Sequence, residues 1–298
     1  MKVALGLPST IPGVTRTQVL DAARIADQGG LDSIWVIDRV VFPNLDPLAT
    51  LTAAAAVTER VRIGTSVLLA TLRNPVVLAK KAASIDVLSA GRLTLGLGVG
   101  GRENDFIASG TDFHTRGRKL TETIDTLRKV WRGEPPVKGV GPVGPKPIQQ
   151  PIPIWLGGGT PETIRRAARL GDAYVVGGGG PAVAKQALSA FRNFWKEEGR
   201  IGEPLTAALT YFSIAPTRKQ AEEQARAYLH DYYAFALQFF DPVQTALLGT
   251  PEEVAEQAEA FRPSGVDILI FFPCSPDPSQ AEAVAGPIQD LVKRKQAG

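Results

Sequence analysis

The stretch IPIWLGGGTPE, residues 152–162, decides the fold. Residues 152–156 are typical of a short buried strand. The three glycines at 157–159 then let the backbone come close to a bound group. Thr160 can cap a helix whose first residue is Pro161, a position where a missing N–H costs nothing. A strand that passes through a short turn into a helix is the repeating unit of α/β proteins.

The same turn predicts an anion site. The free N–H groups of the first helical turn and the positive end of the helix dipole attract negative charge. We therefore interpret 157–160 as the turn that binds the phosphate of a nucleotide-like cofactor. The alternative is a plain connecting turn, since glycine is common in turns, but three glycines exceed what a turn requires.

Composition narrows the class of protein. A chain of 298 residues that is 44% hydrophobic fits two domains or one α/β barrel, which takes about 250 residues. A net charge of +3, with no basic run, argues against nucleic acid. One cysteine, Cys274, excludes an internal disulfide and fits a reducing compartment. The start MKVALGLP reads as a first strand, and no apolar run reaches the roughly 18 residues of a membrane span. We expect a cytoplasmic protein with no membrane contact.

Short apolar strands alternate with longer amphipathic segments. We predict strands at residues 3–7, 33–37, 61–68, 93–99, 152–156, 173–176, 206–214 and 266–271. We predict helices at residues 15–28, 47–58, 75–88, 115–131, 161–169, 182–198, 217–240, 251–261 and 279–293. This order predicts a single (β/α)8 TIM-barrel domain over residues 1–298; an open doubly wound sheet is the alternative.

The junctions support repeated βα units. Four predicted helices begin with a capping residue followed by proline, at residues 46–47, 74–75, 160–161 and 250–251. Three helix ends carry glycine and then aspartate, and we expect Gly30, Gly171 and Gly265 to be left-handed caps. Residues 133–153 contain seven prolines and four glycines. We interpret them as a Pro/Gly-rich loop insertion between the fourth helix and the fifth strand.

The predicted barrel mouth is poor in reactive groups. The strand ends carry mostly glycines and small hydroxyls, with no lysine for a Schiff base. The two histidines, His114 and His230, lie in or next to predicted helices, so we expect no metal site. A bound cofactor would then carry the chemistry; a binding module or inactive barrel is the alternative.

Five segments carry a family resemblance: GLDSIWVID at 30–38, the run from RVRIGTSVLL to GGRENDF at 60–106, RGRKLTETIDTLRKVW at 116–131, LGGGTPE at 156–162 and GTPEEVAEQAEAFRPSGVDILIFFP at 249–273. Together they resemble the bacterial luciferase-like superfamily of flavin- or deazaflavin-dependent (β/α)8 oxidoreductases. The resemblance spans essentially the whole chain, and its segments are specific in combination.

The resemblance implies a cofactor at the barrel mouth. Asp38 matches a catalytic, cofactor-binding carboxylate near the reactive edge of the ring; a salt-bridged or capping surface aspartate is the alternative. Ser66 and Val67 match a non-proline cis peptide that bulges against the middle ring. The other implied cofactor contacts are Gly98, Gly100, Gly157, Gly158, Gly159, Thr160, Gly177 and Gly178.

Four further positions concern the substrate, an anion or proton transfer. Glu103 matches a candidate proton donor of sugar-phosphate relatives; a solvated helix start is the alternative. Those relatives have histidine after the Asp38 equivalent, where this chain has Arg39, which cannot act as a base near neutral pH. We predict that Arg39 binds an anionic substrate or the ring carbonyl. We interpret His114 and Arg116 as an exposed turn, with an anion between them as the alternative.

The sequence thus predicts an oxidoreductase that transfers a hydride between coenzyme F420 and a small organic substrate. F420 is favoured over FMN because GTSVL and GVGGRE resemble the deazaflavin-using branch. One alternative is an FMN-dependent monooxygenase supplied with reduced flavin by a reductase partner. Another is a non-catalytic flavin-binding barrel. Relatives imply a homodimer.

Overall fold

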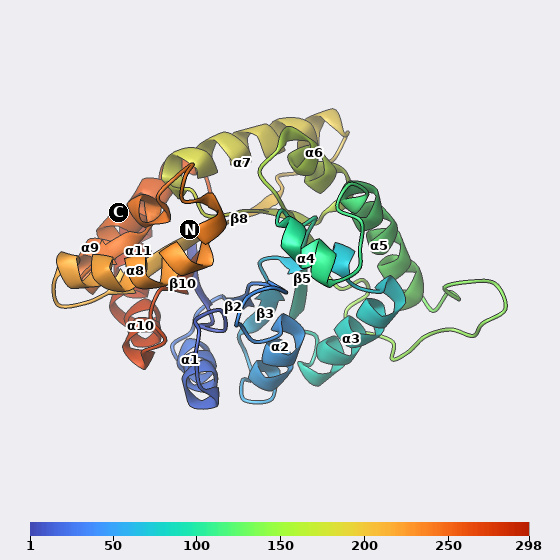
Figure 1. Ribbon diagram of the computed structural model, residues 1–298, viewed down its shortest axis with the longest axis horizontal. Helices are drawn as coiled ribbons and strands as arrows, with labels where there is room; N and C mark the ends of the chain where they lie inside the picture. The colour runs from blue at the N-terminus through green and yellow to red at the C-terminus, as the bar shows by residue number, and fades with distance from the viewer. Residues whose placement is uncertain (298) are drawn as a thin grey trace.

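The computed structural model describes residues 1–297, which form a closed ring of parallel strands surrounded by helices (Figure 1). The ring strands are β1 (Lys2–Gly6), β2 (Ser33–Val36), β3 (Arg62–Thr65), β5 (Leu93–Gly98), β6 (Ile154–Gly157), β7 (Ala173–Val176), β8 (Leu205–Ile214) and β10 (Ile268–Pro273). Strand β10 pairs with both β8 and β1, which closes the sheet. The predicted (β/α)8 barrel is confirmed.

Helices follow the strands and cover the outside of the ring (Figure 1). They are α1 (Arg16–Gln28), α2 (Pro47–Ala55), α3 (Pro75–Leu88), α4 (Glu103–Ala108), α5 (Arg116–Trp131), α6 (Pro161–Leu170), α7 (Gly180–Glu197), α8 (Arg218–Tyr232), α9 (Pro251–Ala258), α10 (Pro278–Ala283) and α11 (Gln289–Ala297). The four predicted caps are confirmed, because Asp46, Asn74, Thr160 and Thr250 each accept a hydrogen bond from a first-turn N–H. These caps fix where four of the helices begin.

The glycine–aspartate junctions return the chain to the sheet. Gly30 and Gly265 are left-handed, with φ of 74° and 69°. The prediction is wrong for Gly171, which is extended at φ −87° and ψ 160°. At this junction Asp172 stabilises the return of the chain to the sheet. Its N–H donates to the Ile154 carbonyl and its carboxylate accepts from the Ile154 N–H, each at 2.8 Å. The aspartate therefore fixes the register of the incoming strand.

Three predicted elements differ in the structure. The predicted strand 61–68 is divided into β3 and β4 (Leu68–Leu69) by a cis peptide at Ser66–Val67. The predicted helix 217–240 ends at Tyr232, followed by short helical turns η2 (Ala234–Ala236) and η3 (Pro242–Thr245) and by strand β9 (Leu247–Gly249). The predicted helix 279–293 is α10, a wider turn η5 (Val284–Ile288) and α11, because Gly286 leaves the helical conformation ahead of Pro287.

The Pro/Gly-rich residues 133–153 contain neither helix nor strand, as predicted, and part of this segment projects from the barrel beside α3 and α5 (Figure 1). Its returning end is anchored at Gln149. The Gln149 backbone N–H and its side-chain amide both donate to the buried carboxylate of Asp86, at 2.9 and 2.7 Å. This contact holds the start of β6 against α3.

The buried apolar residues form two clusters. The larger cluster lies between the strands and the surrounding helices. The smaller one fills the ring, where Trp35 and Trp155 pack with centroids 4.8 Å apart, and continues to tyrosines of α8. Within residues 1–297 there is no helix with the length and apolar character required to cross a membrane.

Gly96→Ala tests the close approach of β5 to β3. A Cβ at residue 96 would lie 1.9 Å from the Thr65 carbonyl oxygen, a backbone atom that cannot move aside. We expect a loss of about 3 kcal/mol or more in the free energy of unfolding, measured in urea. Gly141→Ala, whose Cβ meets nothing within 4 Å, is the control and should be near neutral. An unchanged Gly96→Ala protein would contradict this packing.

Candidate cofactor and substrate site

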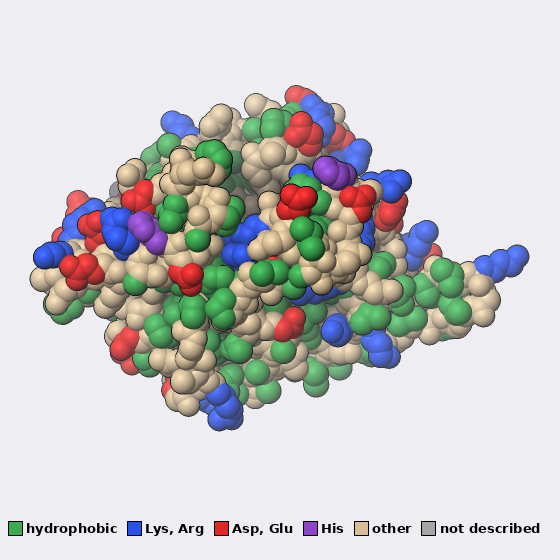
Figure 2. Space-filling model, viewed as in Figure 1, with side chains coloured by type: hydrophobic (Ala, Val, Ile, Leu, Met, Phe, Trp, Pro, Cys, Tyr) green, Lys and Arg blue, Asp and Glu red, His purple; other side chains and the backbone are tan. Residues whose placement is uncertain are grey.

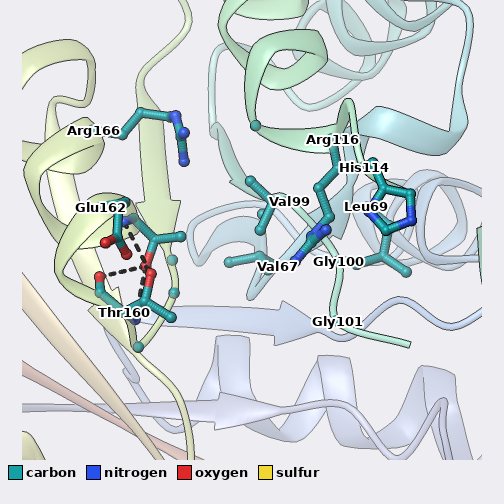
Figure 3. Close-up of a pocket in the computed structure, with 16 residues that line it drawn as sticks. Val67, Leu69, Val99, Gly100, Gly101, His114, Arg116, Thr160, Glu162 and Arg166 are labelled. Carbon is teal, nitrogen blue, oxygen red and sulfur yellow. Dashed lines mark hydrogen bonds between the residues drawn. The ribbon is translucent and has the colours of Figure 1, made fainter. Parts of the chain in front are cut away.

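A cavity of about 650 Å³ opens at the carboxyl ends of β4, β5 and β6 (Figure 3). This size suits a small-molecule cofactor. Its wall is lined by Val67, Leu69, Gly98, Val99, Gly100, Gly101, His114, Arg116, Gly117, Gly157, Gly158, Gly159, Thr160, Glu162, Thr163 and Arg166. The structure therefore brings together most of the cofactor contacts that the sequence predicts, from three different βα connections.

At one end of this cavity, Val67 lies against bare backbone. A Cβ on Gly98 would be 2.5 Å from a Val67 methyl group, and a Cβ on Gly157 would be 2.8 Å from the other. The peptide bond between Ser66 and Val67 is cis, as the resemblance implies. The buried Ser66 hydroxyl has no hydrogen-bond partner among the described residues. Because residues 98 and 157 are both glycines, the Val67 side chain has room to pack against their backbone.

Three basic side chains and one carboxylate, that of Glu162, also line this cavity. Thr160 caps α6 and exchanges hydrogen bonds with Thr163, so the first turn of α6 is fixed beside the glycine turn. Figure 3 shows Arg166 on one side of the gap and Arg116 with His114 on the opposite side. Arg116 is held by its own hydrogen bond to the Phe113 carbonyl, at 2.8 Å. Basic side chains of α5 and α6 and the Glu162 carboxylate thus face one volume, while the Thr163 N–H in the first turn of α6 already donates to Thr160.

His114 lies in an exposed turn, as predicted, and both His114 and Arg116 also line the cavity. Arg166 was missed altogether. A signal existed, because Thr160, Thr163 and Arg166 follow one another at intervals of three and so share a face of the helix.

Asp38 lies behind the cavity wall. It is 3% exposed and does not line the cavity. Its carboxylate accepts from the Leu69 N–H at 2.8 Å and from both terminal nitrogens of Arg73, at 2.5 and 3.2 Å. Burial raises the pKa of Asp38, against the opposing charge of Arg73. All its contacts therefore hold the segment that follows Val67.

Arg39 and Asp105 form a buried pair on the other side of the mouth. Arg39 Nε lies 3.7 Å from Asp105 Oδ2, and its terminal nitrogens donate to the carbonyls of Val41 and Tyr232. Burial, followed by the neighbouring charge of Arg102, lowers the pKa of Arg39. Asp105 also accepts from the backbone N–H groups of residues 40 and 41, so this cluster ties the loop after β2 to α4. Sequence reasoning did not single out Asp105.

A second cavity, of about 550 Å³, adjoins Arg39, and we call it the aromatic pocket. It is lined by Arg39, Val41, Phe42, Pro43, Asn104, Asp231, Tyr232, Ala234 and Phe235. Figure 2 shows basic side chains in a hollow between the positions of α8 and α4. Asp231 and Tyr232, at the end of α8, therefore form part of the wall of this pocket.

The remaining predicted residues lie elsewhere. Gly177 and Gly178 line a third cavity of about 480 Å³, which shares Gly158 and Gly159 with the first. Glu103 is exposed at the first position of α4 and lines none of these three cavities. In residues 1–297 no group of three or more His, Cys, Asp or Glu side chains is arranged to hold a metal ion.

Comparison with known proteins gives the family. The luciferase-like monooxygenase family matches residues 3–268, so the chain belongs to this family. An uncharacterised protein of Mycobacterium tuberculosis (strain ATCC 25618 / H37Rv) is 32% identical over 270 residues, which are 80% of this chain and 89% of that protein. An F420-dependent glucose-6-phosphate dehydrogenase of Amycolatopsis mediterranei (strain U-32) is 34% identical over 167 residues, half of each chain.

The fold is also that of a solved relative. An F420-dependent secondary alcohol dehydrogenase in complex with an F420-acetone adduct superposes with a TM-score of 0.84 at 20% identity, over 98% of this chain and 99% of that one. The prediction of a luciferase-like enzyme, dependent on F420 or a flavin, is confirmed at this coarse level.

Asp38→Asn and Arg73→Gln test the ion pair behind Val67. Each removes one partner of a largely buried pair, so each should lower the free energy of unfolding by about 1–3 kcal/mol. The double variant should lose clearly less than the sum, because both changes remove the same contact. Urea unfolding of the four proteins measures the coupling.

The same variants separate positioning from direct contact. If Asp38 acts by holding residues 67–69 through Arg73, both single variants weaken cofactor affinity by similar factors. Loss of affinity in Asp38→Asn alone, with Arg73→Gln unaffected, would instead give Asp38 a direct role at the cofactor.

Proposed function

We propose that this chain transfers a hydride between coenzyme F420 and a small organic substrate. One observation carries the proposal: a single cavity combines an apolar, glycine-lined surface at Val67 with three basic side chains, those of His114, Arg116 and Arg166, beside the one carboxylate of Glu162. A cofactor with a planar ring joined by a short chain to a phosphate has the matching arrangement of an apolar part and a negatively charged part. The F420-dependent relatives support the choice of cofactor.

The residues present fit such a group. Gly101 and Gly159 have no atom within 4 Å of a would-be Cβ, so the backbone there is open to a ligand. Val67 would support the ring, and Arg116, Arg166 and His114, which line the cavity together with Glu162, would hold the phosphate. F420, when bound, supplies the hydride-transfer chemistry. The chain contributes orientation and the exclusion of water.

The proposal leaves three predicted roles as predictions. Asp38 has its carboxylate occupied by Arg73 and Leu69, which supports positioning over proton transfer. Glu103 is exposed, and nothing around it supports or contradicts a catalytic part. Arg39 borders the aromatic pocket, which supports a place beside the substrate.

A second candidate function is FMN-dependent monooxygenation with reduced flavin from a reductase partner. The specific observation in its favour is the number of basic groups at the phosphate end. Three basic side chains suit the terminal dianionic phosphate of FMN at least as well as an internal phosphodiester, which carries one charge. Oxygen consumption with reduced FMN would distinguish this reaction from hydride transfer.

We also propose a homodimer, on the basis of the family resemblance. Exposed apolar side chains on α3, including Val77 and Leu88, and on the neighbouring Pro/Gly-rich loop, including Val137, are compatible with a covered face.

Separate fluorescence titrations with F420 and FMN test the cofactor. We expect F420 to bind at micromolar concentration or tighter, and FMN at least about tenfold more weakly. Tighter binding of FMN would favour the monooxygenase. Binding of neither ligand would contradict the proposed function, whereas binding of F420 with no hydride transfer to any alcohol or carbonyl substrate would favour a non-catalytic barrel.

Gly159→Asp tests the anion end. Residue 159 has an open Cβ direction, whereas a side chain at Gly158 would be strained at φ 146° and would meet Thr163 at 2.5 Å. The new carboxylate should weaken cofactor affinity at least about tenfold relative to Gly159→Asn, which has the same size without the charge. Equal affinities of the two variants would show that no anion binds beside residue 159.

A further inference from the structure

Tyr174 connects β7 to the glycine turn that follows β6. Its side chain is fully buried, and its ring packs against Phe191 of α7 with the two centroids 4.9 Å apart. Its hydroxyl donates a hydrogen bond to the Gly158 carbonyl at 2.5 Å. Burial raises the pKa of Tyr174, so the hydroxyl keeps its proton near neutral pH and remains a donor. A side-chain donor with a fixed place in the core thus holds one carbonyl of the glycine turn.

The glycine turn lies between two cavities. Gly158 and Gly159 line both the first cavity and the third one, whose wall also includes Tyr174. Strand β6 lies between β5 and β7 in the sheet. The first cavity is lined by residues from the end of β5, and the third cavity by residues of β7 and the loop after it. The turn therefore separates the two cavities, with Tyr174 on the side of the third.

The hydrogen bond from Tyr174 fixes the orientation of the peptide between Gly158 and Gly159. This peptide is trans, because it is not among the three cis bonds of residues 1–297. In a planar trans peptide the carbonyl and the N–H point in opposite directions. The Gly158 carbonyl points to Tyr174 on the β7 side, so the Gly159 N–H points to the β5 side, where the first cavity lies. Within the described residues this N–H has no hydrogen-bond partner.

The start of α6 leaves few other backbone N–H groups for a ligand. The N–H groups of Thr160 and Thr163 donate to each other's hydroxyl, at 3.0 and 3.4 Å. Pro161 has no N–H. The Glu162 N–H bonds to the carboxylate of its own side chain, and this contact lowers the pKa of that carboxyl. Gly159, with open space around its would-be Cβ, is thus the position before α6 whose N–H is open to a ligand.

We propose that Tyr174 is a positioning residue for the cofactor phosphate: its hydroxyl holds the Gly158 carbonyl so that the Gly159 N–H faces the first cavity as a donor. Without this hydrogen bond the peptide would be free to turn, because two successive glycines restrict backbone rotation very little. An N–H that donates to an anion forms a stronger bond than one between neutral groups. This role rests on the proposed function, and Tyr174 fulfils it through the turn rather than by contact with the phosphate.

Ligands with and without the phosphate measure this contribution. Fluorescence titration compares FMN with riboflavin or, where F420 is the cofactor that binds, F420 with its deazaflavin fragment that lacks the phosphate. In wild-type protein the phosphate-bearing ligand should bind at least about tenfold more tightly. Tyr174→Phe, which keeps the ring in the core, should reduce this ratio at least about threefold. Its affinity for the phosphate-free ligand should stay within about twofold of wild type.

Tyr228→Phe is the matched control, because it also removes a buried tyrosine hydroxyl from one hydrogen bond, that with Thr10 at 2.7 Å. Tyr228 lines none of the three cavities, so this variant should keep the full ratio. A Tyr174→Phe protein with the wild-type ratio would overturn the proposal. An equal loss of affinity for both ligands would also overturn it, since that result marks a merely structural role.

A measurement on the wild-type protein tests the same contact without a change at Tyr174. In protein that contains isotope-labelled glycine, the phosphate-bearing ligand should shift the Gly159 amide resonance much more than the phosphate-free ligand does. Gly159→Ala, whose Cβ meets nothing within 4 Å, identifies this resonance by its disappearance. Equal shifts with the two ligands would contradict the proposal. Failure of the proposed function has a different signature, because neither F420 nor FMN would then bind to the wild-type protein.

Discussion

The first cavity depends on one contact, the packing of the Val67 side chain against the backbone of Gly98 and Gly157. The closed parallel ring brings the carboxyl ends of neighbouring strands to one edge, so a residue after β3 meets residues of β5 and β6. A Cβ atom on Gly98 would lie 2.5 Å from one Val67 methyl group, and a Cβ atom on Gly157 would lie 2.8 Å from the other. Any larger residue at either position would therefore displace the Val67 side chain. Behind Val67, Asp38 and Arg73 fix the chain at Leu69.

Local chemistry made much of this predictable from sequence. The caps at Asn74 and Thr160 depend on residues two or three positions away, so the start of each helix could be predicted without tertiary information. The glycine turn at 157–160 and its cap depend likewise on one short segment. The barrel itself followed from the alternation of apolar strands with amphipathic helices, since that order leaves few ways to bury both faces of a parallel sheet.

The parts that escaped prediction depend on contacts between distant residues. The partner of Asp38 is Arg73, 35 positions later, and that of Arg39 is Asp105. No local pattern identifies such pairs. The helix predicted to run to residue 240 ends at Tyr232, where Tyr228 and Tyr232 pack into the barrel interior and short helical turns follow. The wall of the aromatic pocket results from that early ending.

The protonation of the mouth explains why the chain needs a cofactor. Burial raises the pKa values of the tyrosines around the aromatic pocket and that of Cys274, so these groups keep their protons near neutral pH. Asp38 is engaged by Arg73, and arginines do not act as bases. Among the described residues that line the first cavity, His114 is the one histidine, and it lies beside Arg116. These side chains can bind a ligand and exclude water, so we expect the reactive group to belong to a bound cofactor.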